Sequence, residues 1–484
     1  MQPSIIDISK KVFLKRPILE DILSKYGSET LLEYSAGFSG SNEAVPVERK
    51  KEFITALAGE VKRVLGDEAS SRIKEQLLNN YFVSTADHLG PLSHPFFLNS
   101  NMLAGLNVGL SEKIKLTDWV VLACSNVSLN NSSYPRGVQF HTQKKDGLEL
   151  KSFSLFPGTM RHQPVYNLPG YTKDTARQLR NILRGLFYAQ VPASDIREAA
   201  EFFNSQDVLN LPSYSDQTMF INSRIFKNFF APSLTPLNLT YINQEYLTVK
   251  LLENHWGLDT EIHRLMFDDD CRISLLELFE GVPGAFSFKE DRGTFLFWGF
   301  DLNSKKRIRL MLKRNVLVSA DGLFSMPLKP EIISAALKNG VLIPSMLLNM
   351  LVVGGYYGVK CLGGFSQTSY LTWMLDAYKK IFPNSTVGDS KTLCGDFIFA
   401  DIMADGNQAF AATGMDLLLY KKQFNPEAFV ELCKTKTLSG VMERVMPILF
   451  KILYPNEPNY FWPENAYKPD FSISQPFSHP IIKL

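Results

Sequence analysis

A chain of 484 residues is longer than one hydrophobic core normally supports, so two or more domains are expected. Hydrophobic residues make up 45% and charged residues 21% of the chain, a balance that excludes a disordered protein. The formal net charge of +2 provides no strong field to attract nucleic acid or an acidic membrane, which argues against both as partners.

The first part of the chain, residues 1–80, is predicted to be a helical segment. Pro17 suits the first turn of a helix, and hydrophobic residues over 47–65 recur at three- and four-residue intervals. Gly66 then supplies a helix stop, and Asp67 can cap the helix that follows.

From residue 81 the pattern changes to strands. Residues 81–86 are strand-like, a helix is predicted within 95–106, and residues 118–128 are an apolar run typical of a strand buried on both faces. Strand, helix and strand at this spacing predict a βαβ unit with a parallel pair. Two further strands are predicted at 137–142 and 148–156.

The rest of the chain alternates between the two patterns. Residues 172–285 are predicted to be helical, and their prolines suggest a linker or lid over 205–240. A strand hairpin is predicted over 294–319, turning near Asn303 and Ser304. The helices predicted after it cover residues 330–338, 370–381 and 426–454.

These elements predict the α/β class, with a mixed α+β arrangement left open. The expected architecture has at least one βαβ-type mixed sheet, an N-terminal helical segment and large helical insertions. The predicted division is a helical segment at 1–80, an α/β domain at 81–190, a mainly helical region at 191–290 and a second α+β region at 291–484.

One uncharged stretch, 341–359, is long enough to span a membrane. It contains Pro344 and Asn349, and the chain has no second segment like it. The sequence therefore favours a buried helix that leads into a glycine-rich turn. The five cysteines never form a C-x-x-C pair, and together these features predict a soluble, cytoplasmic protein.

The densest group of chemically active side chains lies between residues 84 and 101. Asp87, His88 and His94 fall within eight residues there, and a Gly-Pro turn could bring both rings toward one point. His88 and His94 are therefore candidate ligands of a divalent transition metal such as zinc, iron or manganese. A third ligand would come from Asp87, His141 or His162. The spacing matches no metal motif, so a metal-free polar pocket and a structural role are the alternatives.

In an enzyme built on these residues, a histidine would act as general base, because its ordinary pKa lies near neutral pH. Arg136 could orient an anionic group, although an ordinary turn explains its polar loop equally well. The predicted catalytic set is Asp87, His88, His141 and Arg136. Cys124 is a candidate nucleophile, but a buried structural thiol is the commoner outcome at the end of an apolar strand.

A glycine-rich stretch at 354–369 is the second candidate site. Glycines let backbone amides approach a ligand, and a helix beginning near Thr368 would offer free N–H groups to an anion. The predicted cofactor contacts are Gly358, Lys360, Gly363, Gly364, Ser366 and Gln367. The pattern matches neither nucleotide-binding glycine motif, so tight turns between packed elements explain it as well.

Two charged clusters have simpler interpretations. Three aspartates at 268–270 precede a predicted helix, whose N-terminus favours negative charge. Six basic residues over 305–314 fit the solvated face of a hairpin, with a phosphate-bearing partner as the alternative.

The leading functional prediction is an enzyme that acts on a small polar or anionic substrate, in its metal-dependent form a hydrolase or lyase. The alternative is a non-catalytic protein that binds a small molecule or a partner in a metal-free polar pocket. Neither nucleic acid nor a membrane is expected as a partner.

Overall fold

The centre of the molecule is a five-stranded sheet in which every neighbouring pair of strands is parallel. The computed structural model describes residues 4–41, 43–92, 94–110, 117–130, 137–144, 147–186, 191–230, 237–397, 401–404, 408–421, 425–457 and 481–483. The strands of the central sheet are β1 (Phe82–Ser84), β2 (Asp118–Ala123), β5 (Asn238–Asn243), β14 (Lys360–Gly363) and β15 (Leu393–Cys394).

The order of these strands, β15-β14-β1-β2-β5, places the first strand of the chain in the middle. Ser84 of β1 pairs with Val121 of β2 on one side and with Leu362 of β14 on the other. The chain builds outward from β1 to β5 and then crosses to β14 and β15. This reversal creates a topological switch point between the carboxyl ends of β1 and β14, where ligand sites of open parallel sheets lie.

Alternate side chains of the sheet enter two different hydrophobic cores. On β2, Trp119 and Val121 belong to one core, whereas Val120 and Leu122 belong to the other. Successive side chains of a strand point to opposite faces, so a strand that lies between two cores is apolar throughout. All of β2 is buried, which confirms the predicted strand with two buried faces.

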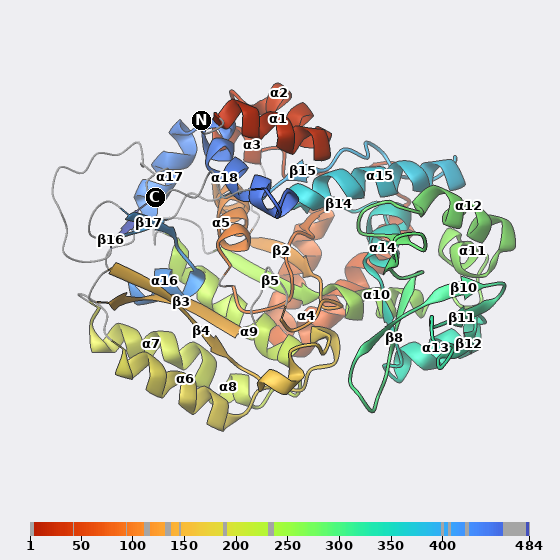
Figure 1. Cartoon of the computed structure of the whole chain (residues 1–484), viewed down its shortest axis with the longest axis horizontal. Coiled ribbons are helices and arrows are strands. Elements are labelled where there is room, and N and C mark those ends of the chain that lie inside the picture. The colour runs from red at the N-terminus through yellow and green to blue at the C-terminus, as the bar shows by residue number, and fades with distance from the viewer. Residues whose placement is uncertain are drawn as a thin grey trace.

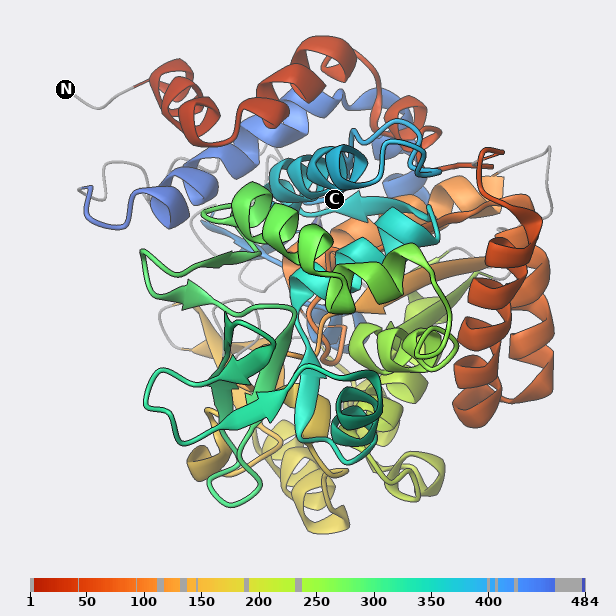
Figure 2. The same cartoon turned by 90° about the vertical axis from the view of Figure 1, so that its right-hand side faces the viewer.

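Helices precede, separate and follow these strands (Figures 1 and 2). Those before β2 are α1 (Ile5–Lys15), α2 (Pro17–Tyr26), α3 (Leu31–Ser35), α4 (Val47–Asn79) and α5 (Pro95–Leu110). Those between β2 and β8 are α6 (Lys173–Gly185), α7 (Ala193–Asn204), α8 (Gln206–Leu209), α9 (Tyr214–Phe226), α10 (Gln244–Leu252), α11 (Glu261–Phe267) and α12 (Asp269–Phe279). Those after β12 are α13 (Pro330–Lys338), α14 (Met346–Met350), α15 (Phe365–Ile381), α16 (Gly414–Leu419), α17 (Pro426–Thr435) and α18 (Leu438–Leu453). Helices from both ends of the chain pack together, α1 and α2 against α18 and α3 against α17 (Figure 1).

Shorter antiparallel strands form small sheets outside the central one. They are β3 (Gly137–Lys144), β4 (Gly147–Ser154), β6 (Phe286–Ser287), β7 (Arg292–Gly293), β8 (Phe297–Phe300), β9 (Arg307–Arg309), β10 (Met311–Lys313), β11 (Val316–Val318), β12 (Ser325–Pro327), β13 (Leu342–Pro344), β16 (Asp401–Ala404), β17 (Gln408–Ala411) and β18 (Ile481–Lys483). β3 and β4 confirm the two strands predicted at 137–142 and 148–156, and they pair with each other. The β8–β9 pair confirms the predicted hairpin, but its second strand is divided into β9, β10 and β11.

The predicted α/β class is confirmed, since β1, α5 and β2 form a βαβ unit with parallel strands. The central sheet takes strands from three of the four predicted parts of the chain, and the exact division stays a prediction. The prediction missed β5. This strand has only six residues and lies between two helices, and the spacing of hydrophobic residues in so short a segment does not distinguish a strand from a helix. Pairing with β2 along its whole length fixes this segment as a strand.

The predicted lid over 205–240 also differs from the structure. Its central part is α9, which is buried along most of its length and packs against β5. Asp216 in this helix is buried and accepts a hydrogen bond of 2.7 Å from Arg63 of α4. Residues 214–226 are therefore a core helix.

The uncharged stretch at 341–359 is buried, as predicted, but it is not one continuous helix. It begins with β13, in which Pro344 pairs with Phe297, and continues through α14 into a π-helical turn at Leu351–Tyr356. Among the described residues, no helix combines the length and the apolarity that crossing a membrane requires.

Gly66 divides α4 into two helices that lie side by side (Figure 2), with Ser70 Oγ donating to Ala58 O at 2.8 Å. Its φ of 88° and ψ of −179° confirm the predicted helix stop. A residue with a side chain is strained in this conformation, so we expect Gly66→Ala to lower the free energy of unfolding by about 1–3 kcal/mol.

A matched control lies in the same element. A Cβ on Gly59, which is helical, would meet nothing within 4 Å. Gly59→Ala should raise the free energy of unfolding by about 0.5–1 kcal/mol, because alanine is the better helix former. Denaturant titrations of both variants measure the two shifts, and shifts of the same sign would contradict the strain assigned to Gly66.

Candidate functional site

Polar side chains gather at the edge of the central sheet where its parallel strands end. They are Asp87 and His88 after β1, Cys124, Ser125 and Asn126 after β2, Asn243 as the last residue of β5 and Glu245 after it, Ser366 and Gln367 after β14, and Asp396 after β15. The N-termini of α5, α10 and α15 face the same edge, because each of these helices follows its strand. Helix N-termini carry partial positive charge, so this edge favours a ligand with negative charge.

Asp87 is fully buried beside the switch point. Its Oδ2 accepts a hydrogen bond of 2.8 Å from Asn101, whose own oxygen accepts one of 2.9 Å from Trp119. Its Oδ1 has no hydrogen-bond partner among the described residues. Burial raises the pKa of Asp87 to about 8; hydrogen bonds from Asn101 and Tyr241 oppose the rise, and the neighbouring carboxyl group of Asp396 adds to it.

Asp396 is the second buried carboxyl group of this edge. Its Oδ2 accepts a hydrogen bond of 2.8 Å from the backbone N–H of Phe365, the first residue of α15. The residue before the helix must be glycine, because a Cβ on Gly364 would lie 2.6 Å from that oxygen. Its Oδ1 lacks a partner among the described residues, and burial raises the pKa of Asp396 to about 7.

Two further buried atoms near the switch point lack described partners, Ser100 Oγ and Gln367 Oε1. Ser100 lies beside the chain at Gly395, where an added Cβ would clash with its hydroxyl. Buried polar atoms normally form hydrogen bonds within the protein. A buried polar atom without a partner is therefore expected where a bound ligand supplies the missing hydrogen bond.

Glu245 has the opposite character, because both of its oxygens are occupied. Its carboxylate accepts hydrogen bonds from Ser125 N–H at 2.6 Å, from Ser125 Oγ, and from the amides of Asn126 and Asn349 at 2.8 Å each. Burial raises its pKa, and the bonds from Ser125 oppose the rise. Glu245 thus connects the ends of β2 and β5 with α14. The sequence prediction missed it together with β5.

Two half-buried arginines also reach this edge. Arg16 donates to Ser366 Oγ at 3.2 Å, at the start of α15. Arg307 donates to Asn126 O and to Ser128 Oγ, and its guanidinium lies 4.5 Å from the ring of Trp298. Burial lowers the pKa of both groups. Neither has an ion-pair partner among the described residues.

The structure brings the rings of His88 and His94 together, as the predicted turn requires. Both contact Phe97, at centroid distances of 5.9 and 5.0 Å, and burial with the nearby His88 lowers the pKa of His94 to about 4. The described residues do not assemble the predicted three-ligand metal site, since no group of three His, Cys, Asp or Glu side chains among them could hold a metal ion.

His141 lies away from the site to which the sequence prediction assigned it. Its Nδ1 is 2.7 Å from Asp416 Oδ2, and its N–H donates to the other oxygen at 2.7 Å, which connects β3 to the start of α16. No hydrogen bond or ion pair in the described chain joins it to Asp87. His162, the other distant candidate, accepts a bond from its neighbour Arg161. Arg136 lies outside the described residues.

Cys124 is buried, and its sulfur lies 3.6 Å from both Asn126 and Glu245. Burial, together with the charge of Glu245, raises its pKa well above the ordinary value for a thiol. A thiol held in its protonated form is a poor nucleophile, so these contacts favour the structural alternative.

The predicted glycine-rich loop is divided by a strand. Gly358, with a φ of 62°, and Lys360 lie at the amino end of β14, away from the switch point. Gly363, Gly364, Ser366 and Gln367 lie at its carboxyl end and in the first turn of α15. The six predicted contacts therefore cannot line one site, and only the second group stands beside Asp396.

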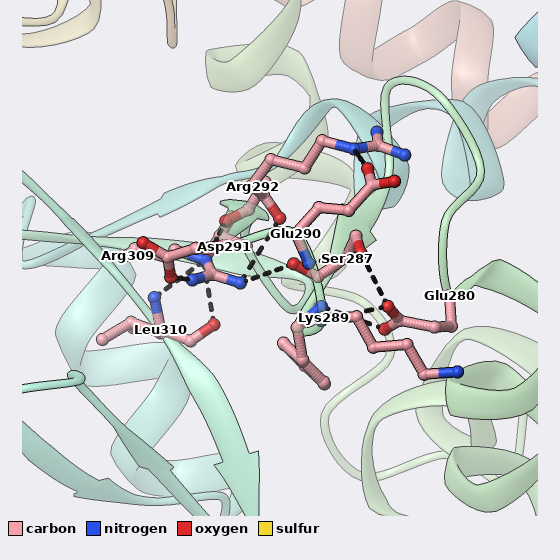
Figure 3. Close-up of polar contacts among 11 residues, drawn as sticks. Glu280, Ser287, Lys289, Glu290, Asp291, Arg292, Arg309 and Leu310 are labelled. Carbon is pink, nitrogen blue, oxygen red and sulfur yellow. Dashed lines mark hydrogen bonds and ion pairs between the residues drawn. The ribbon is translucent and has the colours of Figure 1, made fainter.

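One residue from each charged cluster, Asp268 and Arg309, has a clear local structural role. Asp268 caps α12 by accepting a bond of 2.8 Å from Cys271 N–H, which agrees with the predicted preference of a helix N-terminus for negative charge. Figure 3 shows the guanidinium of Arg309 among the backbone oxygens of the β6–β7 hairpin, where it donates to Ser287 O and Gly293 O at 2.8 Å each. Arg309 therefore has a structural role.

Comparison with models of known families and with curated proteins finds no match to this chain.

Proposed function

We propose that this chain is an enzyme that transfers protons to or from a small substrate with an anionic group, at the carboxyl edge of its central sheet. The observation that carries the proposal is the pair Asp87 and Asp396, which flank the switch point. Each is buried, has one oxygen without a described partner, and has a pKa raised toward neutrality. Carboxyl groups of this kind can give and take a proton near neutral pH.

The two carboxyl groups support distinct roles in one reaction. Each of the two carboxyl groups can hold a proton near neutral pH, because burial raises both pKa values and the charge of Asp396 adds to the rise at Asp87. The protonated group would act as general acid and its partner as general base. Hydrolases and lyases, the two reaction types predicted from the sequence, both need such transfers. His88, on the loop that carries Asp87, keeps its predicted role as a second base.

The surrounding charge supports an anionic substrate. The N-termini of α5, α10 and α15 face the edge, and Arg16 reaches it without an ion-pair partner among the described residues. Arg307 also reaches the edge, but the nearby charge of Glu245 already acts to raise its pKa. A buried guanidinium is costly unless an anion accompanies it, and its planar donors suit carboxylate and phosphate groups.

The test is turnover of defined mixtures of carboxylated and phosphorylated metabolites, followed by mass spectrometry. We expect the natural chain to deplete at least one compound, and Asp87→Asn and Asp396→Asn to do so about 100-fold more slowly. Asp259→Asn, an exposed aspartate, is the matched control and should retain the full rate.

Full activity in both site variants would overturn the proposal. Binding of a metabolite without its depletion would favour the alternative, a non-catalytic protein that binds a small molecule at the same edge.

A further inference from the structure

A cavity of about 370 Å³ lies at the opposite end of the sheet from Asp87 and Asp396. It is enclosed by α2, α15 and the first residues of β14 and β15, and none of the side chains of the candidate site lines it. Its volume falls in the range of small-molecule sites. Gly358 and Lys360, which the sequence singled out as ligand contacts, are in its lining.

The inner wall of this cavity is mainly apolar, with Thr372 and Thr392 as buried polar residues in its lining. Ile22 of α2, Phe82 of β1, and Leu371 and Leu375 of α15 are buried side chains that line it, and Trp373 lies half-buried beside them. Such a wall suits a branched or aromatic side chain.

The rim carries charges of both signs in equal number. Its charged residues are Lys25, Lys360, Lys391, Asp21, Asp376 and Asp389. No ion pair joins any two of them within the described chain. Lys25 lies 4.6 Å from the ring of Tyr26, and Asp376 and Asp389 accept hydrogen bonds from Ser390 Oγ and Lys391 N–H. Ammonium and carboxylate groups thus surround one opening without neutralising each other at contact distance.

We propose that this cavity binds a free amino acid with a large apolar side chain. The carboxylate of such a ligand would meet the lysines, its ammonium group the aspartates, and its side chain the apolar wall. The balance of charge argues against a polyanion such as a nucleotide, for which a net positive rim is expected. The ligand site is separate from the proposed catalytic edge.

The test is isothermal titration of the full chain with L-phenylalanine, L-leucine and L-tryptophan. Two matched probes each lack one charge: phenethylamine lacks the carboxylate and 3-phenylpropionate lacks the ammonium group. We expect at least one amino acid to bind, and both one-charge probes to bind at least 10-fold more weakly than phenylalanine. No binding of any of the three amino acids at millimolar concentration would overturn the proposal, as would equal binding of a one-charge probe.

Variants that exchange the charges of the rim test whether the amino acid binds in this cavity. Lys391→Glu and Asp21→Lys exchange exposed rim charges and should each weaken amino-acid binding at least 10-fold. Lys380→Glu, an exposed lysine of α15 outside the lining, is the matched control and should leave affinity unchanged. Asp87→Asn should also leave it unchanged, so failure of the catalytic proposal and failure of this one are distinguishable. Binding that neither rim variant weakens would place the ligand elsewhere and overturn the assignment.

Discussion

Asp87→Asn should make the protein more stable, by an amount that grows between pH 5 and pH 9. Burial raises the pKa of Asp87 from 3.8 to about 8, so the folded chain keeps a proton that the unfolded chain has already lost. Between these two values the stability of the natural protein falls as the pH rises. The amide cannot ionise and can still accept the bond from Asn101. We expect a gain on the order of 4 kcal/mol at pH 9.

Urea denaturation at pH 5, 7 and 9 measures this effect. The natural chain should lose stability across the series, whereas the curve of Asp87→Asn should be flatter. Asp396→Asn should lose less stability than the natural chain between pH 5 and pH 7, since burial raises the pKa of Asp396 to about 7. Asp259→Asn is the exposed control and should follow the natural chain. Parallel curves for the natural chain and Asp87→Asn would show that Asp87 is not a buried acid with a raised pKa.

The same chemical change at Glu245 should have the opposite sign. One of its oxygens accepts two hydrogen bonds from Ser125, and the other accepts bonds from the amides of Asn126 and Asn349 and from the thiol of Cys124. Whichever oxygen becomes an amide nitrogen in Glu245→Gln, that nitrogen meets at least one N–H donor with a donor of its own, the backbone N–H of Ser125 on one side or the side-chain amides of Asn126 and Asn349 on the other. Loss of a buried, fully bonded carboxylate costs about 3–5 kcal/mol, and we expect a loss of that size.

Denaturation at pH 7 compares Glu245→Gln with Glu277→Gln, an exposed glutamate of α12. The control should stay within about 0.5 kcal/mol of the natural chain. If both variants are equally stable, the hydrogen bonds assigned to Glu245 do not hold the strand ends together. We expect the change in the free energy of unfolding to be positive for Asp87→Asn and negative for Glu245→Gln. Opposite signs would show that Asp87 has an oxygen without a hydrogen-bond partner, whereas the carboxyl group of Glu245 stabilises the fold.

The part of the fold that sequence could predict is the part specified locally. β1, α5 and β2 each have their own pattern, and Asp87 and His88 follow a strand-like run directly. Asp396 could not be found in this way. It follows β15, a two-residue strand defined only by its pairing with β14. Its closeness to Asp87 arises from the strand order of the sheet, which no local pattern contains.

Nearness along the chain is also a poor guide to the site. His141 follows His88 by 53 residues, but its partner is Asp416, far along the chain. The glycine-rich stretch was treated as one loop because its glycines are close in sequence. Most of them serve packing or turns: a Cβ on Gly355, for example, would lie 2.9 Å from Tyr378.

The central position of β1 has a consequence for how the chain acquires its structure during synthesis. β1 leaves the ribosome early and can pair with β2 soon afterwards, but its other neighbour is β14. Until residues 360–363 have been made, one edge of Phe82–Ser84 has no strand beside it. Open apolar edges promote association between chains, and late long-range pairing slows folding. We therefore expect the nascent chain to depend on protection of this edge, by its own N-terminal helices or by a chaperone, until β14 has been synthesised.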